Sequence, residues 1–114
     1  MKLNQSEAFL KGSEKEWEVV GEGVKRKIMG YNNQLMLVEV FFDEGGVGPM
    51  HSHFHSQVTY VASGEFDVTI DGVTKTLVTG DSFYIEPNKM HGAICKKAGV
   101  LIDTFSPIRE DFMQ

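Results

Sequence analysis

Hydrophobic and polar residues alternate along most of the chain, in short runs that turn residues separate. Glu65–Ile70 is the clearest run, because every second residue is apolar and falls on one face of a strand. The alternation resumes over Val73–Val78, directly after the dipeptide Asp71-Gly72. Asp-Gly between two alternating runs predicts a tight hairpin, since the type I′ turn needs a positive φ at both central residues.

Other short apolar runs predict further strands. Leu35–Phe42 is almost continuously apolar and rich in residues that favour strands, which indicates a strand buried on most sides. The remaining expected strands are Val58–Val61, Ser82–Ile85, His91–Cys95 and Val100–Phe105. Nothing from 17 to 106 carries a sustained helical period. Many short strands with regular turns are typical of an all-β sandwich or barrel.

Length, composition and charge narrow the class of protein. The 114 residues suit one domain, and 41% hydrophobic with 24% charged residues is ordinary for a globular fold. The net charge of −5 argues against a nucleic-acid partner. The single cysteine, Cys95, cannot close a disulfide within the chain. Without a signal-like start or a membrane-length apolar run, we expect a cytoplasmic protein with no membrane partner.

Three of the four histidines lie within five residues, at positions 51, 53 and 55. In a strand, side chains at i and i+2 point to the same side, so the imidazoles of His51 and His53 are expected side by side. That spacing suits two nitrogen ligands on one metal ion. The alternative is a set of exposed histidines on a polar loop.

The residues around these histidines resemble the two sequence motifs of the cupin superfamily. Residues 45–64 resemble the first motif, and residues 80–91 resemble the second. The resemblance implies a jelly-roll barrel, that is, a double-stranded β-helix, with one divalent metal ion in its mouth. It places the metal ligands at His51, His53, Gln57 and His91.

Position 57 departs from the family, which normally has glutamate there. The side-chain oxygen of Gln57 can bind a metal but adds no charge, so the ion would keep its full positive charge. That favours a Lewis-acid role toward an anionic substrate. Alternatively, Gln57 lies behind the ligands. The family does not usually have a metal ligand at the position of His55. The alternatives to a ligand are a residue that contacts the substrate or one that lies on the rim of the pocket. Nitrogen-rich sites accept Ni, Zn, Fe or Mn.

The last expected strand carries an acidic residue among apolar neighbours. Leu101, Asp103 and Phe105 share one face of that strand, which would look into the barrel. A buried carboxylate is costly unless it has a partner or a task. The alternative is a solvated aspartate at the end of a strand.

This ending, together with residues 21–31, resembles the KdgF family of pectin-degradation cupins over roughly residues 17 to 113. The resemblance implies a metal-dependent enzyme that converts 4,5-unsaturated monouronates, small anionic sugars, to linear ketonised sugars. The family's functional residues fall on Asp103, Phe105 and Arg109. Departures from common cupin residues at Phe54, Glu86 and Asn88 remove no ligand but alter the rim of the pocket.

Other functions and roles stay open at this point. The same pocket would suit a cupin dioxygenase or other oxidoreductase, or a non-catalytic module that binds metal and sugar. Arg26 is a further candidate inside the barrel, Arg109 has a surface alternative, and Cys95 reads best as a buried inert thiol. We expect one domain over 1–114, with an arm at 1–15 that Phe9 and Leu10 anchor, a barrel over 17–106 and a tail at 107–114. Edge strands and the arm favour a homodimer.

Overall fold

The computed structural model describes residues 4–113. Within them lie ten strands and two short 3-10 helices. In chain order these are η1 (Gly12–Glu14), β1 (Glu18–Gly21), β2 (Val24–Asn32), β3 (Leu35–Phe42), β4 (Val47–His51), β5 (Ser56–Val61), β6 (Glu65–Ile70), β7 (Val73–Val78), β8 (Ser82–Ile85), β9 (His91–Lys97), β10 (Gly99–Ser106) and η2 (Glu110–Met113). Neither of these helices approaches the length and hydrophobicity of a membrane span.

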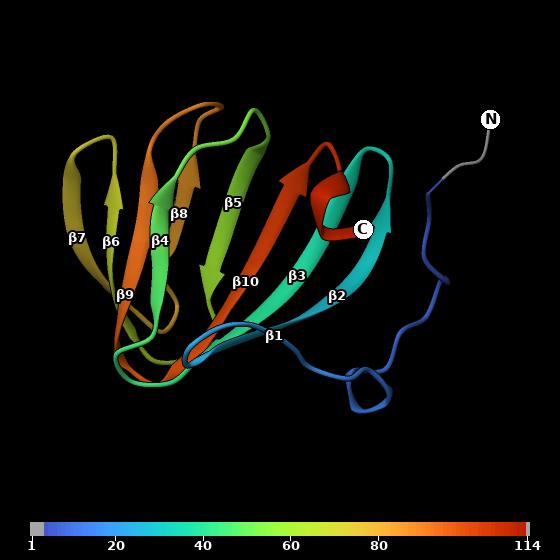
Figure 1. Cartoon of the computed structure of the whole chain (residues 1–114), viewed down its shortest axis with the longest axis horizontal. Coiled ribbons are helices and arrows are strands. Elements are labelled where there is room, and N and C mark those ends of the chain that lie inside the picture. The colour runs from blue at the N-terminus through green and yellow to red at the C-terminus, as the bar shows by residue number, and fades with distance from the viewer. Residues whose placement is uncertain (1–3, 114) are drawn as a thin grey trace.

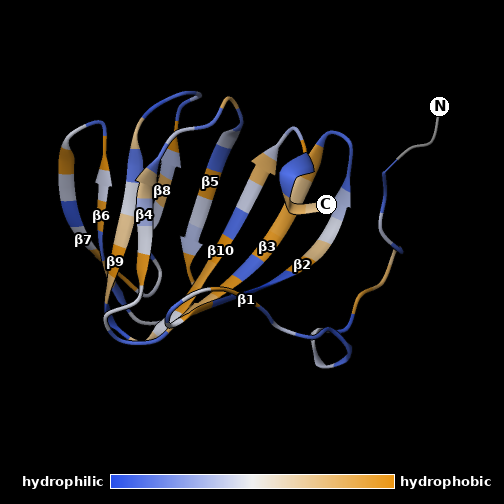
Figure 2. Cartoon of the chain, in the orientation of Figure 1, coloured by the Kyte–Doolittle hydropathy of each residue, from blue (hydrophilic) through white to orange (hydrophobic). Residues whose placement is uncertain are grey.

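The strands form two antiparallel sheets that face each other (Figure 1). The larger sheet has the order β1-β2-β3-β10-β5-β8, and the smaller one has the order β4-β9-β6-β7. Apolar and polar residues alternate along several of these strands, as Figure 2 shows. The predicted all-β fold is therefore confirmed, and the alternation reflects one face of each sheet turning toward the interior.

The predicted hairpin between the two alternating runs is also confirmed. β6 and β7 pair in register from Glu65 opposite Val78 to Ile70 opposite Val73. Asp71 and Gly72 connect them with φ angles of 49° and 82°. Both lie in the left-handed region that the type I′ turn requires.

Strand pairing brings the two histidine-containing stretches together. β4 pairs with β9, and His51 lies directly opposite His91. The pair is irregular between Gly48 and His51, where the backbones approach closely. A Cβ on Gly92 would lie only 2.8 Å from the carbonyl oxygen of Gly48, so glycine is required there.

One local prediction is wrong. The strand that carries His51 ends at that residue, whereas we expected it to continue through His53. The chain bends at Phe54 and His55 before β5 begins. The bend is needed because β5 belongs to the other sheet.

The interior divides into two apolar clusters around a cleft. One cluster contains Phe42, Phe66 and Leu101, and the other contains Met36 and Phe105. The C-terminal tail joins the second cluster through a residue that is 2% exposed, Ile108. The tail is therefore part of the packed body.

The N-terminal arm runs along the edge of β2, with Phe9 in solvent and Leu10 partly buried. Gln5 forms a bridge with Asn32, and the backbone N–H of Ser6 donates to the carbonyl oxygen of Tyr31 at 2.9 Å. Phe9 is 92% exposed, so the expectation that it anchors the arm is wrong. Backbone hydrogen bonds hold this part of the arm instead.

Candidate metal centre

Three imidazole rings converge at one end of the two sheets. His51 ends β4, His53 follows in the loop and His91 begins β9. The ring centroids of His51 and His91 are 4.3 Å apart, and those of His53 and His91 are 4.8 Å apart. One ring nitrogen from each histidine lies within 4.8 Å of the other two, so the three can hold a single metal ion.

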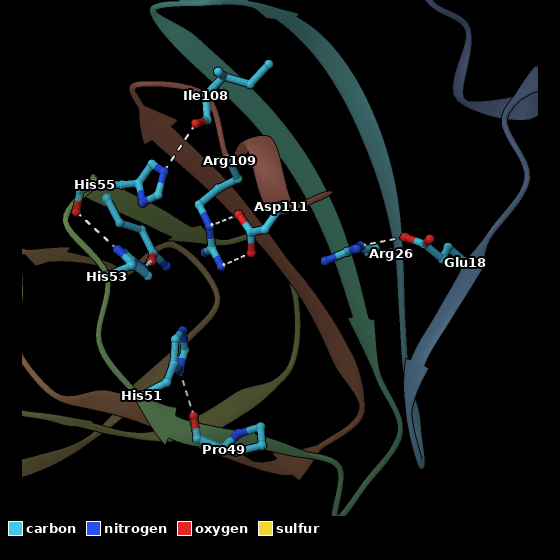
Figure 3. Close-up of polar contacts among 10 residues, drawn as sticks. Glu18, Arg26, Pro49, His51, His53, His55, Ile108, Arg109 and Asp111 are labelled. Carbon is cyan, nitrogen blue, oxygen red and sulfur yellow. Dashed lines mark hydrogen bonds and ion pairs between the residues drawn. The ribbon is translucent and has the colours of Figure 1, made fainter. Parts of the chain in front are cut away.

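Each of these rings is held by a backbone carbonyl. The Nδ1 atoms of His51, His53 and His91 lie 2.8, 3.2 and 2.9 Å from the carbonyl oxygens of residues 49, 55 and 89. Figure 3 draws the contacts of His51 and His53. A carbonyl oxygen only accepts hydrogen bonds, so each Nδ1 carries the proton and each Nε2 keeps a free lone pair. Such contacts orient histidine ligands in metal sites.

Two features of the polar atoms fit a bound cation. The Nε2 atom of His91 is buried and has no hydrogen-bond partner among residues 4–113. In addition, the Nε2 atom of His53 lies 3.0 Å from the side-chain oxygen of Gln57. Two lone pairs face each other there, which is unfavourable until a positive charge lies between them. The donor set of three imidazoles and one amide oxygen therefore suits a divalent ion.

A hydrogen-bonded chain leads from Gln57 to Asp103. The side-chain amide nitrogen of Gln57 donates to the hydroxyl oxygen of Thr59 at 2.9 Å and lies 3.4 Å from Oδ1 of Asp103. The hydroxyl of Thr59 donates to the same Oδ1 at 2.7 Å. Thr59 and Asp103 are opposite each other on β5 and β10, so the chain crosses two neighbouring strands.

Burial shifts the protonation of these groups. It lowers the pKa of His91 to about 4 and, together with the charge of Arg109, lowers the pKa of His53. Both imidazoles are therefore neutral near pH 7 and free to bind a metal. Burial also raises the pKa of Asp103 to about 6, although the hydrogen bond from Thr59 and the charge of Arg109 oppose the shift.

His51 and His91 line a cleft of about 1000 Å³ between the two sheets, and the ring of His53 lies beside that of His91. Asp103 and Phe105 contribute to its wall from β10, Arg26 from β2 and Arg109 from the tail. The cleft is larger than one sugar needs, and it carries both cationic and acidic side chains.

The guanidinium groups of Arg26 and Arg109 differ in how many hydrogen bonds they donate to carboxylates of the protein. Arg109 donates through Nε and Nη2 to both carboxylate oxygens of Asp111, at 3.1 and 2.9 Å. Among the residues that the structure describes, Arg26 donates only through Nε, to Glu18 at 2.7 Å. Both guanidinium groups lie over the ring of Phe112, at 3.8 Å for Arg26 and 4.2 Å for Arg109. The aromatic ring keeps the two cations close together.

Comparison with known proteins identifies the family. The cupin domain family matches residues 38–105. The chain is also 48% identical over 99 residues to the pectin degradation protein KdgF of Dickeya dadantii (strain 3937), covering 85% of this chain and 90% of that protein. It is a cupin of the KdgF family.

Solved structures agree with this assignment. An RmlC-like cupin from Shewanella frigidimarina superposes with a TM-score of 0.93 at 54% identity, over 95% of this chain and 97% of that one. KdgF from a Halomonas species gives a TM-score of 0.90 at 38% identity, over 94% and 99% of the two chains. The predicted cupin jelly roll is thereby confirmed.

This cupin brings together most of the residues singled out from the sequence. The cleft is lined by His51, Gln57, His91, Asp103, Phe105 and Arg109. His53 lies next to it, with its ring centroid 4.8 Å from that of His91. His55 lies outside the group of three histidines. Its ring is buried, with Nε2 3.1 Å from the carbonyl oxygen of Ile108, so it fastens the tail to the loop after β4.

Sequence reasoning missed two residues of the site, Thr59 and Phe112. A signal existed for Thr59, because it follows Gln57 by two positions on a strand and so shares its face. Phe112 lies in a short tail without periodicity, and nothing in its neighbours places it over Arg26. Cys95 is 1% exposed and packs in the apolar cluster of Phe42, outside the cleft lining.

Proposed function

We propose that this cupin is a metal-dependent enzyme that converts 4,5-unsaturated monouronates to linear ketonised sugars. The 48% identity to KdgF supports the substrate class. The single observation that carries the proposal is the meeting of three histidines with Gln57 and Asp103 at one site. That arrangement puts an electrophilic site next to a group able to exchange protons.

The reaction needs little from the protein beyond proton transfer and control of charge. The substrate is a ring with a C4=C5 double bond, a C6 carboxylate and a C1 hemiacetal. Opening the hemiacetal releases an enol at C5, and protonation at C4 then yields the ketone. A divalent ion held by His51, His53, Gln57 and His91 would supply Lewis acidity that favours the developing negative charge.

Asp103 is the proposed proton carrier. Its Oδ1 atom is held by Thr59 and Gln57, whereas Oδ2 has no hydrogen bond to any other residue in the described range. Oδ2 is therefore free to take a proton from the hemiacetal hydroxyl and to deliver one to C4. Phe105 would provide an apolar wall for the ring of the sugar, since it lines the same cleft.

The carboxylate of the sugar needs a cationic partner, and both arginines are candidates. Burial and then the charge of Arg109 lower the pKa of His53, but Asp111 occupies the paired N–H groups of Arg109. The Nη groups of Arg26 make no hydrogen bond to other residues in the range 4–113. We assign Arg109 to local charge compensation and Arg26 to the bidentate grip on the carboxylate.

The metal and the assembly complete the proposal. Three imidazoles and an amide favour Ni, Zn, Fe or Mn, with the choice set by supply. A second copy of the chain would cover the outer face of the larger sheet, where Val58, Tyr60 and Tyr84 are each about half exposed. Light scattering on the wild type and on Tyr84→Lys tests this, because a homodimer should shift toward the monomer in the variant.

The decisive experiment follows the conjugated acid by its near-UV absorbance. Unsaturated galacturonate or mannuronate monomer is incubated with the metal-loaded protein, with Asp103→Ala, with His51→Ala and with the exposed control Lys75→Ala. The wild type and the control should speed the loss of absorbance, and Asp103→Ala should lose about 10²- to 10⁴-fold in rate. A metal-loaded wild type that leaves the spontaneous rate unchanged contradicts the proposal.

The same samples separate the rival functions. A dioxygenase in this pocket would consume oxygen during turnover, whereas the proposed reaction proceeds anaerobically. A binding module would return the sugar unchanged.

A further inference from the structure

We propose that Thr59 is a positioning residue that fixes the side-chain amide of Gln57 with its oxygen toward the three histidines. The inference rests on the metal centre of the proposed function and is independent of the sugar. The side-chain amide of Gln57 can adopt two orientations, which differ only in which end carries the oxygen and which the nitrogen. Its hydrogen bonds decide between the two.

The direction of each hydrogen bond determines the orientation. Thr59 has a single hydroxyl hydrogen, and its oxygen lies 2.7 Å from Oδ1 of Asp103. An ionised carboxylate only accepts, so that hydrogen is given to Asp103. The oxygen of Thr59 must then accept from Gln57, which lies 2.9 Å away and can donate only through its nitrogen. The other end of the amide, the oxygen, is left 3.0 Å from Nε2 of His53.

The buried position of Thr59 keeps the side-chain amide of Gln57 in this orientation. Its side chain has no exposed surface, so water cannot replace either hydrogen bond. It stands between Gln57 two residues earlier on β5 and Asp103 directly across on β10. Sheet geometry, not a loop, therefore holds all three groups in line.

The same contacts explain why glutamine suits this site. The side-chain nitrogen of Gln57 lies 2.9 Å from the hydroxyl oxygen of Thr59 and 3.4 Å from Oδ1 of Asp103. A glutamate at position 57 would replace this nitrogen with a carboxylate oxygen. Two neighbouring carboxylates would repel each other, and one would take up a proton. Gln57, Thr59 and Asp103 consequently act as one unit, in which the buried aspartate selects a neutral ligand.

The test uses metal binding alone. Zn²⁺ affinity is measured by competition with a chromogenic chelator, and the visible spectrum of the Co²⁺ form reports the ligand set. The proteins are the wild type, Thr59→Val, Thr59→Ser, Gln57→Ala and the double variant Thr59→Val/Gln57→Ala. Valine matches threonine in shape without the hydroxyl, and serine keeps the hydroxyl without the methyl group. Circular dichroism confirms that each protein is folded.

We expect Thr59→Val to bind Zn²⁺ about 10- to 100-fold more weakly than the wild type, as loss of a ligand's supporting hydrogen bond does elsewhere. Its Co²⁺ spectrum should move toward that of Gln57→Ala. Thr59→Ser should keep the wild-type affinity and spectrum, and the double variant should bind no more weakly than Gln57→Ala.

Three outcomes would overturn the inference while leaving the enzymatic proposal standing. These are a folded Thr59→Val with wild-type affinity and spectrum, equal losses in the valine and serine variants, and a Gln57→Ala protein that binds Zn²⁺ as tightly as the wild type. A wild type that binds no divalent ion would instead overturn the proposed function and this inference together.

Discussion

At the scale of single residues, the sequence identified side chains better than their contacts. Spacing and the cupin resemblance together pointed to His51 and His91, because two recurring motifs constrain ligand positions strongly. The pairing of Arg109 with Asp111 and the stacking of Arg26 on Phe112 carried no such signal. They depend on where the tail folds back, and local patterns of residues do not encode that.

Asp103 should make the stability of the metal-free protein depend on pH. Its pKa is raised from 3.8 to about 6 in the folded state, so the folded state binds the proton more tightly than the unfolded state does. The contribution of Asp103 to the free energy of unfolding should therefore fall as pH rises from about 4 to about 6, and stay level above that. The lowered pKa of His91 acts in the opposite direction, but equally in the wild type and in a variant at position 103. The Asp103→Asn variant has no carboxyl group at this position and therefore does not lose this stability. Its free energy of unfolding, relative to that of the wild type, should increase by on the order of 1 to 3 kcal/mol between pH 4 and pH 7.

Urea unfolding in the presence of a chelator, at half-unit steps of pH, measures this difference. Asp67→Asn is the matched control, because Asp67 accepts a hydrogen bond from Thr76 on the smaller sheet and does not line the cleft. Parallel stability curves for the wild type and Asp103→Asn would contradict the prediction.

Arg26 should affect substrate binding more than turnover. Arg26→Gln removes the charge that we assign to the sugar carboxylate, and a hydrogen bond between charged groups is worth about 1.5–3 kcal/mol. KM should rise about tenfold or more while kcat changes little. Steady-state rates on the unsaturated monouronate give both constants. Lys75→Gln, which removes an exposed positive charge outside the cleft lining, serves as the control. Equal KM values for all three proteins would rule out this role.

At the scale of elements, alternation predicted most strands but not their ends. The strand over Leu35–Phe42 and the hairpin at Asp71 agree with the structure residue by residue. The end of β4 at His51 does not, because the alternation of side chains continues past the point where the backbone leaves the sheet. The position of the C-terminal tail is likewise not predicted by the residues within it. The tail is held by the packing of Ile108 in the core and by the contact between His55 and the carbonyl oxygen of Ile108.

Ile108 should be a main source of stability for the tail. The residue is 2% exposed and packs in one cluster with Met36, Val38 and Phe105. Ile108→Ala should lower the free energy of unfolding by about 2–5 kcal/mol, the range for such truncations in a core. Urea unfolding measures the loss, and Met113→Ala, at a residue that is 38% exposed, should cost far less. Similar stabilities of the two variants would show that the tail is not anchored in this way.

At the scale of the whole molecule, seven of the ten strands in the described residues could be named from the sequence, but their order in the sheets could not. β10 lies between β3 and β5, and β9 lies between β4 and β6. These neighbours are far apart in the sequence, and pairings of that kind leave no trace in a local pattern. The cupin resemblance supplied what the pattern lacked, since it implied that the two histidine stretches meet.

Metal binding should stabilise the whole domain, because the ligands come from both sheets. At a free Zn²⁺ concentration one hundred times Kd, the free energy of unfolding should increase by about 2.7 kcal/mol. Thermal unfolding with and without Zn²⁺ measures the effect. His91→Ala should lose most of it, whereas Lys96→Ala, at an exposed residue of β9, should keep it. Equal gains in both variants would mean that Zn²⁺ binds elsewhere.

The fold-back of the tail has a practical consequence for handling the protein. Phe112 and Arg109 line the same cleft as His51 and His91, so anything fused behind the tail starts beside the metal centre. A hexahistidine sequence attached there would bring six competing imidazoles within reach of the ion. Fusion in front of the arm, which runs beside β2 and contributes no residue to the cleft lining, avoids this (Figure 1). Metal contents and affinities are therefore best measured on protein tagged in front of the arm or freed of its tag.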